Sequence, residues 1–271
     1  MAYHLGIIGA GNMAEAIVRG LLRSKVLRPD QIIAADVSPD RRRLFANDLG
    51  VNAVETNAQV AAAAPKCLLL SIKPQQMAAV LTKLAVNLPP DTLLISIAAG
   101  ISSAFIERHL GPAGRWRVIR VMPNTPMLVG QGMAALCRGK NATPDDLAEA
   151  RRIFECAAKV IDVPESLMDA VTAVSGSGPA YVFYLVEQMI RAGTDLGLSE
   201  PDARLLAAQT IAGSAAMLLA SNDTPAELRR KVTSPGGTTQ AAITYLDSQK
   251  VGDSIVEAVK AAAARSKELG A

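Results

Sequence analysis

The stretch Leu5–Ala14, LGIIGAGNMA, decides the fold of the first half of the chain. It joins a short apolar run, Leu5–Ile8, to a glycine turn that opens a helical pattern. Gly9 permits the tight turn, Gly11 lets the backbone approach a pyrophosphate, and Ala14 is small enough for helix and strand to pack. In this strand–turn–helix setting the stretch predicts a dinucleotide site with its phosphates at the helix N-terminus.

The same alternation continues to about residue 163. Continuous apolar runs separated by helical patterns predict a parallel sheet that is covered on both faces. We therefore predict an α/β Rossmann-type cofactor domain over residues 1–163. The further runs with strand character are Gln31–Ala35, Cys67–Ile72, Thr92–Ile97 and Arg117–Met122, and the helical patterns are Asn12–Ser24, Pro39–Leu49, Gln75–Leu88 and Ser102–Leu110.

After Pro164 only helical patterns follow, and they predict an all-α oligomerisation domain over residues 164–271. Pro201–Ala220 is apolar on nearly every face, and a helix of that kind must be covered all round. A domain of this size would struggle to enclose it alone, so we expect it to pack against another subunit of a homo-oligomer. The expected helices are Ser177–Leu196, Pro201–Ala220, Pro225–Val232, Thr239–Gln249 and Asp253–Leu269.

The composition excludes several classes of function. Half of the 271 residues are hydrophobic and the net charge is +3 at pH 7, which is too small to predict a nucleic-acid or membrane-surface partner. Cys67, Cys137 and Cys156 are widely spaced in apolar surroundings, and the chain has two histidines, so we expect neither disulfides nor a metal site. The N-terminus predicts no signal peptide, and the longest apolar run, Ile211–Ala220, is too short to span a bilayer. We therefore expect a metal-free cytoplasmic protein.

The acid Asp36 and the basic residues after it leave the choice between NAD and NADP open. Asp36 ends the second strand at the right distance from the glycine turn to hydrogen-bond the adenosine ribose, which favours NAD. Ser38 and the run Arg41–Arg43 follow at once and could accept a 2′-phosphate, which favours NADP. In a third interpretation, Asp36 only caps a turn and the arginines form a solvated helix face.

Three further motifs follow strands, at the edge of the sheet where ligands lie in such folds. Pro123 and Pro126 hold Asn124 in a stiff turn, where its amide could meet a nicotinamide carboxamide. Lys73 is a candidate acid, although a lysine before a proline is more often a solvated or phosphate-facing charge. The small residues of Val174–Ala180 favour close backbone packing, with a cofactor passing by as the alternative. The three motifs that follow strands are Ser71–Pro74, Ser96–Gly100 and Met122–Pro126.

The stretch Ser234–Thr239, SPGGTT, predicts an anion site at the start of a helix. Pro235 fixes the turn, and we expect the N–H groups of Gly237, Thr238 and Thr239 to face outward. A carboxylate fits such a site, with a charge-assisted hydrogen bond to each N–H. The alternative is a plain helix cap.

The absence of histidine or of paired carboxylates beside these motifs makes strong general acid–base catalysis unexpected. Hydride transfer to a ketone normally needs a histidine or lysine donor, whereas a protonated C=N group is already the electrophile. The chemistry then needs mainly positioning. The motifs therefore favour reduction of an imine that bears a carboxylate.

In this order and spacing the motifs closely resemble those of the pyrroline-5-carboxylate reductase family, over essentially the whole chain. Val232–Thr239 looks like the family signature, and Ser96–Gly100, Met122–Pro126 and Val174–Ala180 support it. The resemblance implies reduction of L-1-pyrroline-5-carboxylate to L-proline, the last step of proline biosynthesis, by NADP(H) or alternatively NAD(H). It also implies C-terminal helices like those of 6-phosphogluconate dehydrogenase, and dimers with swapped helical domains that assemble into rings.

The resemblance further implies the site residues. Ser234 and the N–H groups of Gly237, Thr238 and Thr239 would hold the substrate carboxylate, with Thr239 as the catalytic residue at the ring nitrogen. The family usually has a small or neutral residue where Asp36 stands, so a preference for NADPH is less firmly implied than the reaction, because an acid repels a nearby phosphate. The cofactor positions carried over are Gly9, Gly11, Asn12, Met13, Ala14, Ser38, Asn57, Ser71, Ile72, Lys73, Pro74, Ile97, Ala98 and Ala99.

Three alternatives to this function stay open. The first is reduction of another cyclic imine carboxylate. A β-hydroxyacid dehydrogenase would need a lysine on the first long helix of the second domain, and Ser177–Leu196 contains none. A dinucleotide sensor without turnover would not require the carboxylate pocket that Ser234–Thr239 predicts.

Overall fold

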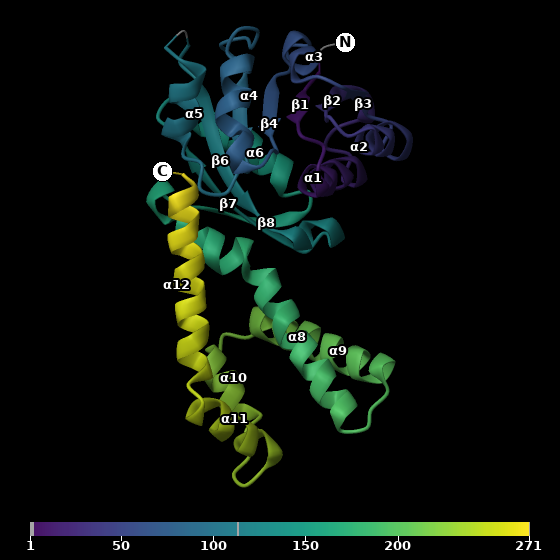
Figure 1. Cartoon of the computed structure of the whole chain (residues 1–271), viewed down its shortest axis with the longest axis vertical. Helices are drawn as coiled ribbons and strands as arrows, with labels where there is room; N and C mark the ends of the chain where they lie inside the picture. Colours follow the sequence, from purple (N-terminus) through teal and green to yellow (C-terminus); the bar gives the residue numbers. More distant parts are fainter. Residues whose placement is uncertain (1–2, 113, 271) are drawn as a thin grey trace. The chain divides into compact units, whose positions relative to one another are not determined.

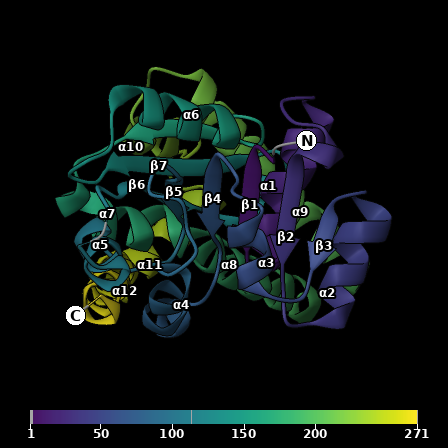
Figure 2. The same cartoon turned by 90° about the horizontal axis from the view of Figure 1, so that it is seen from above.

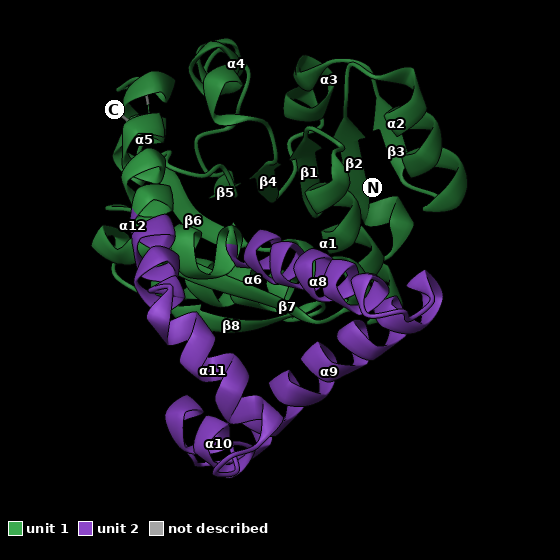
Figure 3. Ribbon diagram, turned by 60° about the horizontal axis from the view of Figure 1, so that its bottom comes forward, with its two compact units in different colours: residues 1–177, 261–271 green, residues 178–260 purple. Residues whose placement is uncertain are grey.

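The structure, a computed structural model, describes residues 3–112 and 114–270. The chain forms two compact units, which Figure 3 draws in different colours. The first unit runs to Ser177 and also takes in the residues from Ala261 onward, and the second unit is Gly178–Lys260. The first unit contains the sheet, and the second is built of helices.

Eight strands form one sheet in the order β3-β2-β1-β4-β5-β6-β7-β8. Figure 2 shows the part of this sheet from β3 to β7. Neighbouring strands are parallel from β3 through to β6, β7 is antiparallel to β6, and β8 is parallel to β7. The first six strands have the Rossmann order, which reverses direction between β1 and β4 and places ligands beyond their carboxyl ends. The strands are β1 Leu5–Ile8, β2 Ile32–Ala35, β3 Asn52–Val54, β4 Cys67–Leu70, β5 Leu93–Ser96, β6 Arg117–Pro123, β7 Gly132–Arg138 and β8 Ala158–Asp162.

Helices cover both faces of this sheet (Figure 1). Successive strand residues point to opposite faces, so Ile7 belongs to the core under α1 and α6, and Ile8 to the core under α3, α4 and α5. A π-helical turn, Leu44–Asp48, continues α2 and places Phe45 in the first core. The helices of this unit are α1 Asn12–Arg23, α2 Pro39–Arg43, α3 Asn57–Ala62, α4 Met77–Leu84, α5 Ser103–Leu110, α6 Pro144–Phe154 and α7 Met168–Val171.

The predicted parallel sheet covered on both faces is confirmed, and three strands are added to it. The apolar runs that were predicted as strands are β1, β2, β4, β5 and β6, each largely buried. The sequence reasoning missed β3, β7 and β8. The strand β3 is only three residues long, and β8 is mostly exposed, so neither presents the continuous apolar run that marked the others.

The first unit extends beyond residue 163, where the sequence analysis placed its boundary. Met168 of α7 is fully buried against the sheet, and a Cβ on Gly176 would lie 2.3 Å from Cε of Met122, so this segment packs closely on β6 and β7. The close packing predicted for Val174–Ala180 is found at Gly176, whereas a Cβ on Gly178 would meet nothing within 4 Å. The end of the C-terminal helix belongs to the same unit, because Ser266 donates a hydrogen bond to Asp169 there.

The second unit buries very little of its apolar surface within one chain. Its helices α8, α10 and α11 contain no buried residue, and only Ala203 and Ala207 of α9 are buried. Large apolar side chains such as Phe183, Leu205 and Leu219 are more than half exposed. The helices are α8 Gly178–Asp195, α9 Glu200–Ala220, α10 Pro225–Lys231, α11 Thr238–Ser248 and α12 Val251–Leu269, of which the last continues into the first unit.

Among the described helices, α9 is the one that is long and apolar enough to cross a membrane by length and composition. The apolar run Ile211–Ala220, which is too short to span a bilayer, is only the second half of this helix. The same composition suits a helix that a second protein chain covers on all sides.

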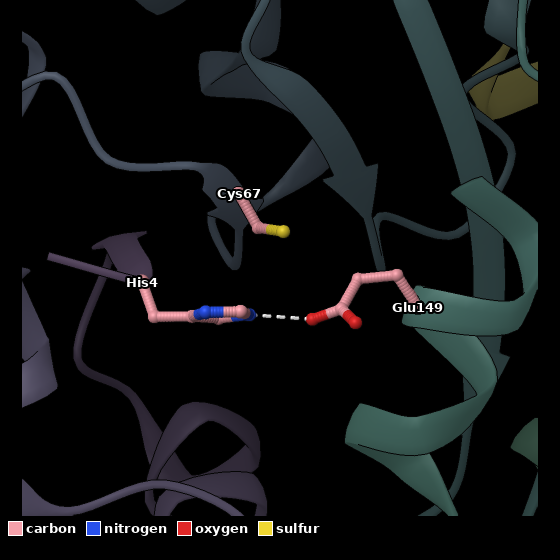
Figure 4. A group of neighbouring side chains, drawn as sticks. All are labelled: His4, Cys67 and Glu149. Carbon is pink, nitrogen blue, oxygen red and sulfur yellow. Dashed lines mark hydrogen bonds and ion pairs between the residues drawn. The ribbon is translucent and has the colours of Figure 1, made fainter. Parts of the chain in front are cut away.

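A polar cluster ties α6 to the amino-terminal edge of the sheet (Figure 4). Nε2 of His4 lies 2.5 Å from Oε1 of Glu149, and the donor and acceptor atoms of these two residues and of Cys67 lie within 4.8 Å of one another. Arg152 donates to the same Glu149 oxygen at 2.8 Å and lies 3.1 Å from Nε2 of His4, where its charge repels a metal ion. Burial raises the pKa of the Cys67 thiol to about 12, which keeps it protonated. The expectation of a metal-free protein stays a prediction.

Glu149 makes stability depend on pH. Burial alone would raise the pKa of Glu149, but hydrogen bonds from Arg152 and His4 lower it from 4.5 to about 2. The stabilisation is therefore fully present above pH 4.5 and is lost as the pH falls toward 2. We expect Glu149→Gln to lower the free energy of unfolding in urea by about 2 kcal/mol at pH 7 and by progressively less below pH 4.5.

Glu155→Gln, at the end of the same helix, is the control. Glu155 is exposed and pairs with Arg151 at 3.3 Å, so its loss should change the free energy of unfolding by less than about 0.5 kcal/mol. A difference between wild type and Glu149→Gln that stays constant from pH 7 to pH 3 would contradict this account.

Candidate active site

The N-terminus of α1 has no side-chain cap. Its N-cap residue, Gly11, provides no hydroxyl, so the N–H groups of the first turn, beginning at Asn12, keep no intrahelical partner and carry the positive end of the helix dipole. A ready-made anion site results. Six other helices begin differently, because a hydroxyl accepts a backbone N–H at Ser38, Thr56, Ser102, Thr143, Ser199 and Thr224.

The two glycines of this turn have different roles. Gly9 has φ +91°, and a Cβ on it would lie 2.5 Å from the carbonyl oxygen of Ser71, so the fold itself requires glycine there. Gly11 has φ −72°, and a Cβ on it would meet nothing within 4 Å. The space in front of Gly11 is therefore left open to a ligand.

That space is a cavity of about 290 Å³ beyond the carboxyl ends of β1, β4, β5 and β6. Lys73 at its rim is exposed, and it forms no ion pair with any residue that the structure describes. The remaining predicted positions Gly9, Ala14, Pro74, Ala98 and Ala99 lie in the same turns, beside the lining residues. The cavity is lined by Gly11, Asn12, Met13, Ser71, Ile72, Lys73, Ile97, Met122 and Pro123.

Asp36 fastens the glycine turn to the end of β2. One carboxylate oxygen accepts the N–H of Ala10 at 2.8 Å and the other accepts the N–H of Ser38 at 2.8 Å. The carboxylate therefore caps a turn, as the third interpretation of the sequence expected. It also lies at the position where a ribose hydroxyl would meet it in a Rossmann fold.

The three arginines after it are not simply a solvated helix face. Arg41 donates to the carbonyl of Ala10 at 2.6 Å and pairs with Glu15 at 2.9 Å, so it buttresses the glycine turn. Arg42 donates to the carbonyls of Asp36 and Val37, both at 2.9 Å. Arg43 is exposed and pairs with Asp40. Arg42 is thus the cation that lies directly beside Asp36.

Neither Asn57 nor Asn124, which were predicted to bind the cofactor, is among the residues that line this cavity. Asn57 lines a second hollow of about 300 Å³, together with Val37. Asn124 uses its amide within the protein, because its Oδ1 accepts the N–H of Met133 at 2.9 Å and its Nδ2 donates to the Ser175 carbonyl at 3.3 Å. These bonds join the end of β6 to β7 and to the segment before α8. A contact of Asn124 with a nicotinamide stays a prediction.

The second predicted site, Ser234–Thr239, lies in the helical unit at the start of α11. Gly236 has φ +72°, and the N–H of Gly237 donates to the Ser234 carbonyl at 3.1 Å. This differs from the expectation that the Gly237 N–H faces outward, because the turn needs that group to close. Gly237 is the N-cap of α11 and brings no side-chain cap, so the N–H groups of Thr238 and Thr239 are the ones left for an anion.

Two arginines that the sequence reasoning did not select lie beside this turn. Arg229 and Arg230 line a hollow of about 420 Å³ between α10 and α11, together with Thr233 and Gln240 on either side of the turn. They add positive charge next to the open N-terminus of α11. Their signal in the sequence was a basic pair at the end of a short helix, which is a common feature of helix C-termini.

The first site fits a dinucleotide on grounds of its geometry. Gly11 leaves room for a pyrophosphate, the first turn of α1 offers free N–H groups, and Lys73 adds a cation at the rim. A Rossmann sheet with such a glycine turn, followed by a helical unit, is typical of nicotinamide-dependent oxidoreductases.

Comparison with known proteins gives the family. A family model described as pyrroline-5-carboxylate reductase dimerisation matches residues 165–269, and one described as NADP oxidoreductase, coenzyme F420-dependent, matches residues 4–100. Over 272 residues, covering 100% of this chain and 99% of the relative, the sequence is 43% identical to a pyrroline-5-carboxylate reductase of Synechocystis sp.. A relative of the same name from Pseudomonas aeruginosa is 42% identical, with 98% of this chain and 96% of the relative covered. The chain belongs to the pyrroline-5-carboxylate reductase family.

Solved structures agree with this assignment. A pyrroline-5-carboxylate reductase from Coxiella burnetii has a TM-score of 0.88 at 36% identity, with both chains covered completely. The Plasmodium falciparum enzyme, solved with NADP bound, has a TM-score of 0.90 at 30% identity, with 99% of this chain and 98% of that chain covered. The prediction of a Rossmann-type domain followed by a helical dimerisation domain is confirmed.

The two glycines of the α1 turn should separate folding from binding. Gly11→Ala should fold with unchanged thermal stability, because its Cβ meets no protein atom, yet raise the KM for the nucleotide at least about tenfold by occupying the phosphate space. Gly9→Ala should instead lower the free energy of unfolding by about 2 kcal/mol. Thermal melts and nucleotide titrations of both variants measure this, and equal nucleotide affinity in Gly11→Ala and wild type would contradict the site.

Asp36 should set the ratio between the two nicotinamide cofactors. Removing its charge should raise kcat/KM with NADPH relative to NADH by about tenfold, because the carboxylate repels a 2′-phosphate. Asp36→Ala also loses the acceptors for Ala10 and Ser38, so both activities should fall, whereas Asp36→Asn keeps an acceptor and should change mainly the ratio. Steady-state rates with both cofactors test this; an unchanged ratio in both variants would place Asp36 away from the ribose.

Proposed function

We propose that this protein reduces L-1-pyrroline-5-carboxylate to L-proline with NADPH, or alternatively NADH. The observation that carries the proposal is the pair of glycine-capped helices. The N-terminus of α1 offers a phosphate site in the sheet unit, and that of α11 offers a carboxylate site in the helical unit. The relatives at 43% and 42% identity carry the name of this reaction, which supports the proposal.

On this proposal the cofactor lies in the cavity at the carboxyl edge of the sheet. The Gly9–Ala14 turn would hold the pyrophosphate, and Asp36, Ser38 and Asn57 would hold the adenosine side. Ser71–Pro74 and Ile97–Ala99 would hold the nicotinamide half. When bound, the cofactor would supply the hydride that reduces the C=N group of the substrate.

The chain itself binds and orients the substrate. The N–H groups of Thr238 and Thr239 and the hydroxyl of Ser234 hold the carboxylate, and Gly237 contributes by closing the turn that aims them. The Thr239 hydroxyl, on a half-buried side chain, would hydrogen-bond the ring nitrogen, which is protonated from solvent before the hydride is transferred. Addition of the hydride to the C=N carbon would then neutralise the iminium charge and leave the ring amine. No residue of the chain needs to act as a strong acid at the reacting ring, since a protonated imine is already electrophilic.

Neither histidine of the chain is available as a general acid at these sites. His4 precedes β1, at the end of that strand opposite to the glycine turn, and is engaged with Glu149. His109 stacks on Phe105 with ring centroids 4.0 Å apart, and its Nδ1 lies 2.9 Å from the carbonyl oxygen of Phe105. This supports an imine as the substrate rather than a ketone. A β-hydroxyacid dehydrogenase is disfavoured because α8 contains no lysine.

The decisive assay follows nicotinamide absorbance with purified protein and racemic pyrroline-5-carboxylate, with NADPH and NADH in parallel. Substrate-dependent oxidation of either cofactor is the expected result. Cofactor binding without oxidation would favour a different cyclic imine carboxylate or the non-enzymatic sensor, and another imine such as 1-piperideine-6-carboxylate in the same assay separates these two.

Thr239 should be important but not indispensable. Thr239→Ala removes one neutral hydrogen bond to the ring nitrogen, so turnover should fall by about fivefold, equivalent to about 1 kcal/mol. The matched control is Thr238→Ala, because Thr238 is exposed and contributes its N–H rather than its hydroxyl. Complete loss of turnover in Thr239→Ala, with cofactor affinity intact, would instead make Thr239 the proton donor.

The helical unit makes the protein an oligomer, since residues 165–269 match a dimerisation family. We propose that dimers form through exchanged helical units, assemble further into rings, and work in the cytoplasm without nucleic-acid or membrane partners. The expected result of light scattering is a mass of at least twice the 28.3 kDa chain. A mass of one chain at micromolar concentration would contradict the proposal, because the apolar surfaces of α8 and α9 would then stay uncovered.

A further inference from the structure

The loop after β5, Ile97–Gly100, packs against the C-terminal end of α12. Gly100 has φ +77°, and a Cβ on it would lie 2.5 Å from the carbonyl oxygen of Ser266 and 2.9 Å from Cβ of Leu269. A Cβ on Gly270 would lie 2.0 Å from the Gly100 carbonyl oxygen. The end of α12 therefore packs backbone to backbone on a loop whose first residue, Ile97, lines the cofactor cavity.

A buried arginine explains how this end of α12 is fixed. Arg120 on β6 is only 4% exposed, and its guanidinium lies 3.8 Å from Oδ1 of Asp169 and 3.6 Å from Oε1 of Glu165. Asp169 accepts a hydrogen bond from the hydroxyl of Ser266 at 2.7 Å. Ser266 is itself 2% exposed, so the sheet, α7 and α12 meet at one buried polar contact.

The second carboxylate holds the other side of the same loop. Glu165 accepts the N–H of Ser103 at 2.7 Å and its hydroxyl at 2.6 Å, at the first residue of α5. The loop from Ile97 to Gly100 is thus flanked by two elements, α5 and α12, that are both fastened to Arg120 through a carboxylate.

The structure assigns to Arg120, Asp169, Glu165 and Ser266 the role of positioning residues for the cofactor loop, an inference that rests on the proposed function. They do not touch the cavity. They fix the loop Ile97–Gly100 against the nicotinamide half of the bound dinucleotide, so that its backbone need not be ordered on binding. Loss of the network lets the loop move, and part of the binding free energy is then spent on ordering it.

The test measures nucleotide dissociation constants by titration without substrate, at a temperature where every variant is folded. Ser266→Ala and Asp169→Ala should weaken NADP(H) binding by about five- to tenfold, because part of the binding free energy is then spent on ordering the loop. Asp169→Asn keeps an acceptor for Ser266 and should restore most of the affinity. The control is Ser254→Ala on the same helix, whose hydroxyl donates to the Lys250 carbonyl at 3.2 Å, and it should bind as wild type does.

Hydrogen–deuterium exchange gives a readout that general destabilisation would not mimic. In Ser266→Ala the peptide that covers Ile97–Gly100 should exchange faster, while peptides from β1 and β4 remain as in wild type. Wild-type affinity and unchanged exchange in Ser266→Ala and Asp169→Ala would overturn the inference and leave the proposed function standing. Failure of the wild-type protein to bind either dinucleotide would overturn both.

Discussion

Two helix N-termini that begin at a glycine are the constraint around which this molecule is arranged. Six of the described helices start at a serine or threonine whose hydroxyl satisfies the first turn, but α1 and α11 start at Gly11 and Gly237, which cannot. Free N–H groups are stable only where water or an anion satisfies them, and the dipole of each helix favours the anion. One such end lies in the sheet unit and the other in the helical unit, so each unit offers one anion site.

The residues around the N-termini of α1 and α11 hold each turn in place, so that the protein contributes to catalysis mainly by positioning its ligands. Asp36, Arg41 and Glu15 brace the first turn through its backbone, and the Gly237 N–H closes the second. These are positioning interactions. They suit the transfer of a hydride to a protonated imine, where orientation supplies most of the rate and no strong acid is needed. The helical unit adds a different requirement, since its apolar helices gain stability only when a second chain covers them.

Structural features that depend on residues close together in the sequence could be predicted, whereas those that depend on residues far apart could not. The buried strands β1, β2, β4, β5 and β6 were predictable because each is a short apolar run, and Leu5–Ala14 predicted the site because its glycines act within one turn. The exposed strand β8 and the three-residue β3 carry no such pattern. The contact of Asp36 with Ala10 spans 26 residues and that of Ser266 with Asp169 spans 97, so no local pattern reveals them. The engaged N–H of Gly237 depends on turn geometry that sequence spacing does not specify.

The measurement that tests the central claim most directly is a backbone amide NMR titration of the perdeuterated protein with NADP+ and, separately, with L-proline. The account predicts that NADP+ shifts the amide resonances of Asn12 and Met13, and that L-proline, in the presence of NADP+, shifts those of Thr238 and Thr239. The amide of Asp146, which the hydroxyl of Thr143 already caps, should stay unchanged with both ligands. Unshifted Thr238 and Thr239 amides at saturating L-proline would contradict the claim that the open start of α11 holds the substrate carboxylate.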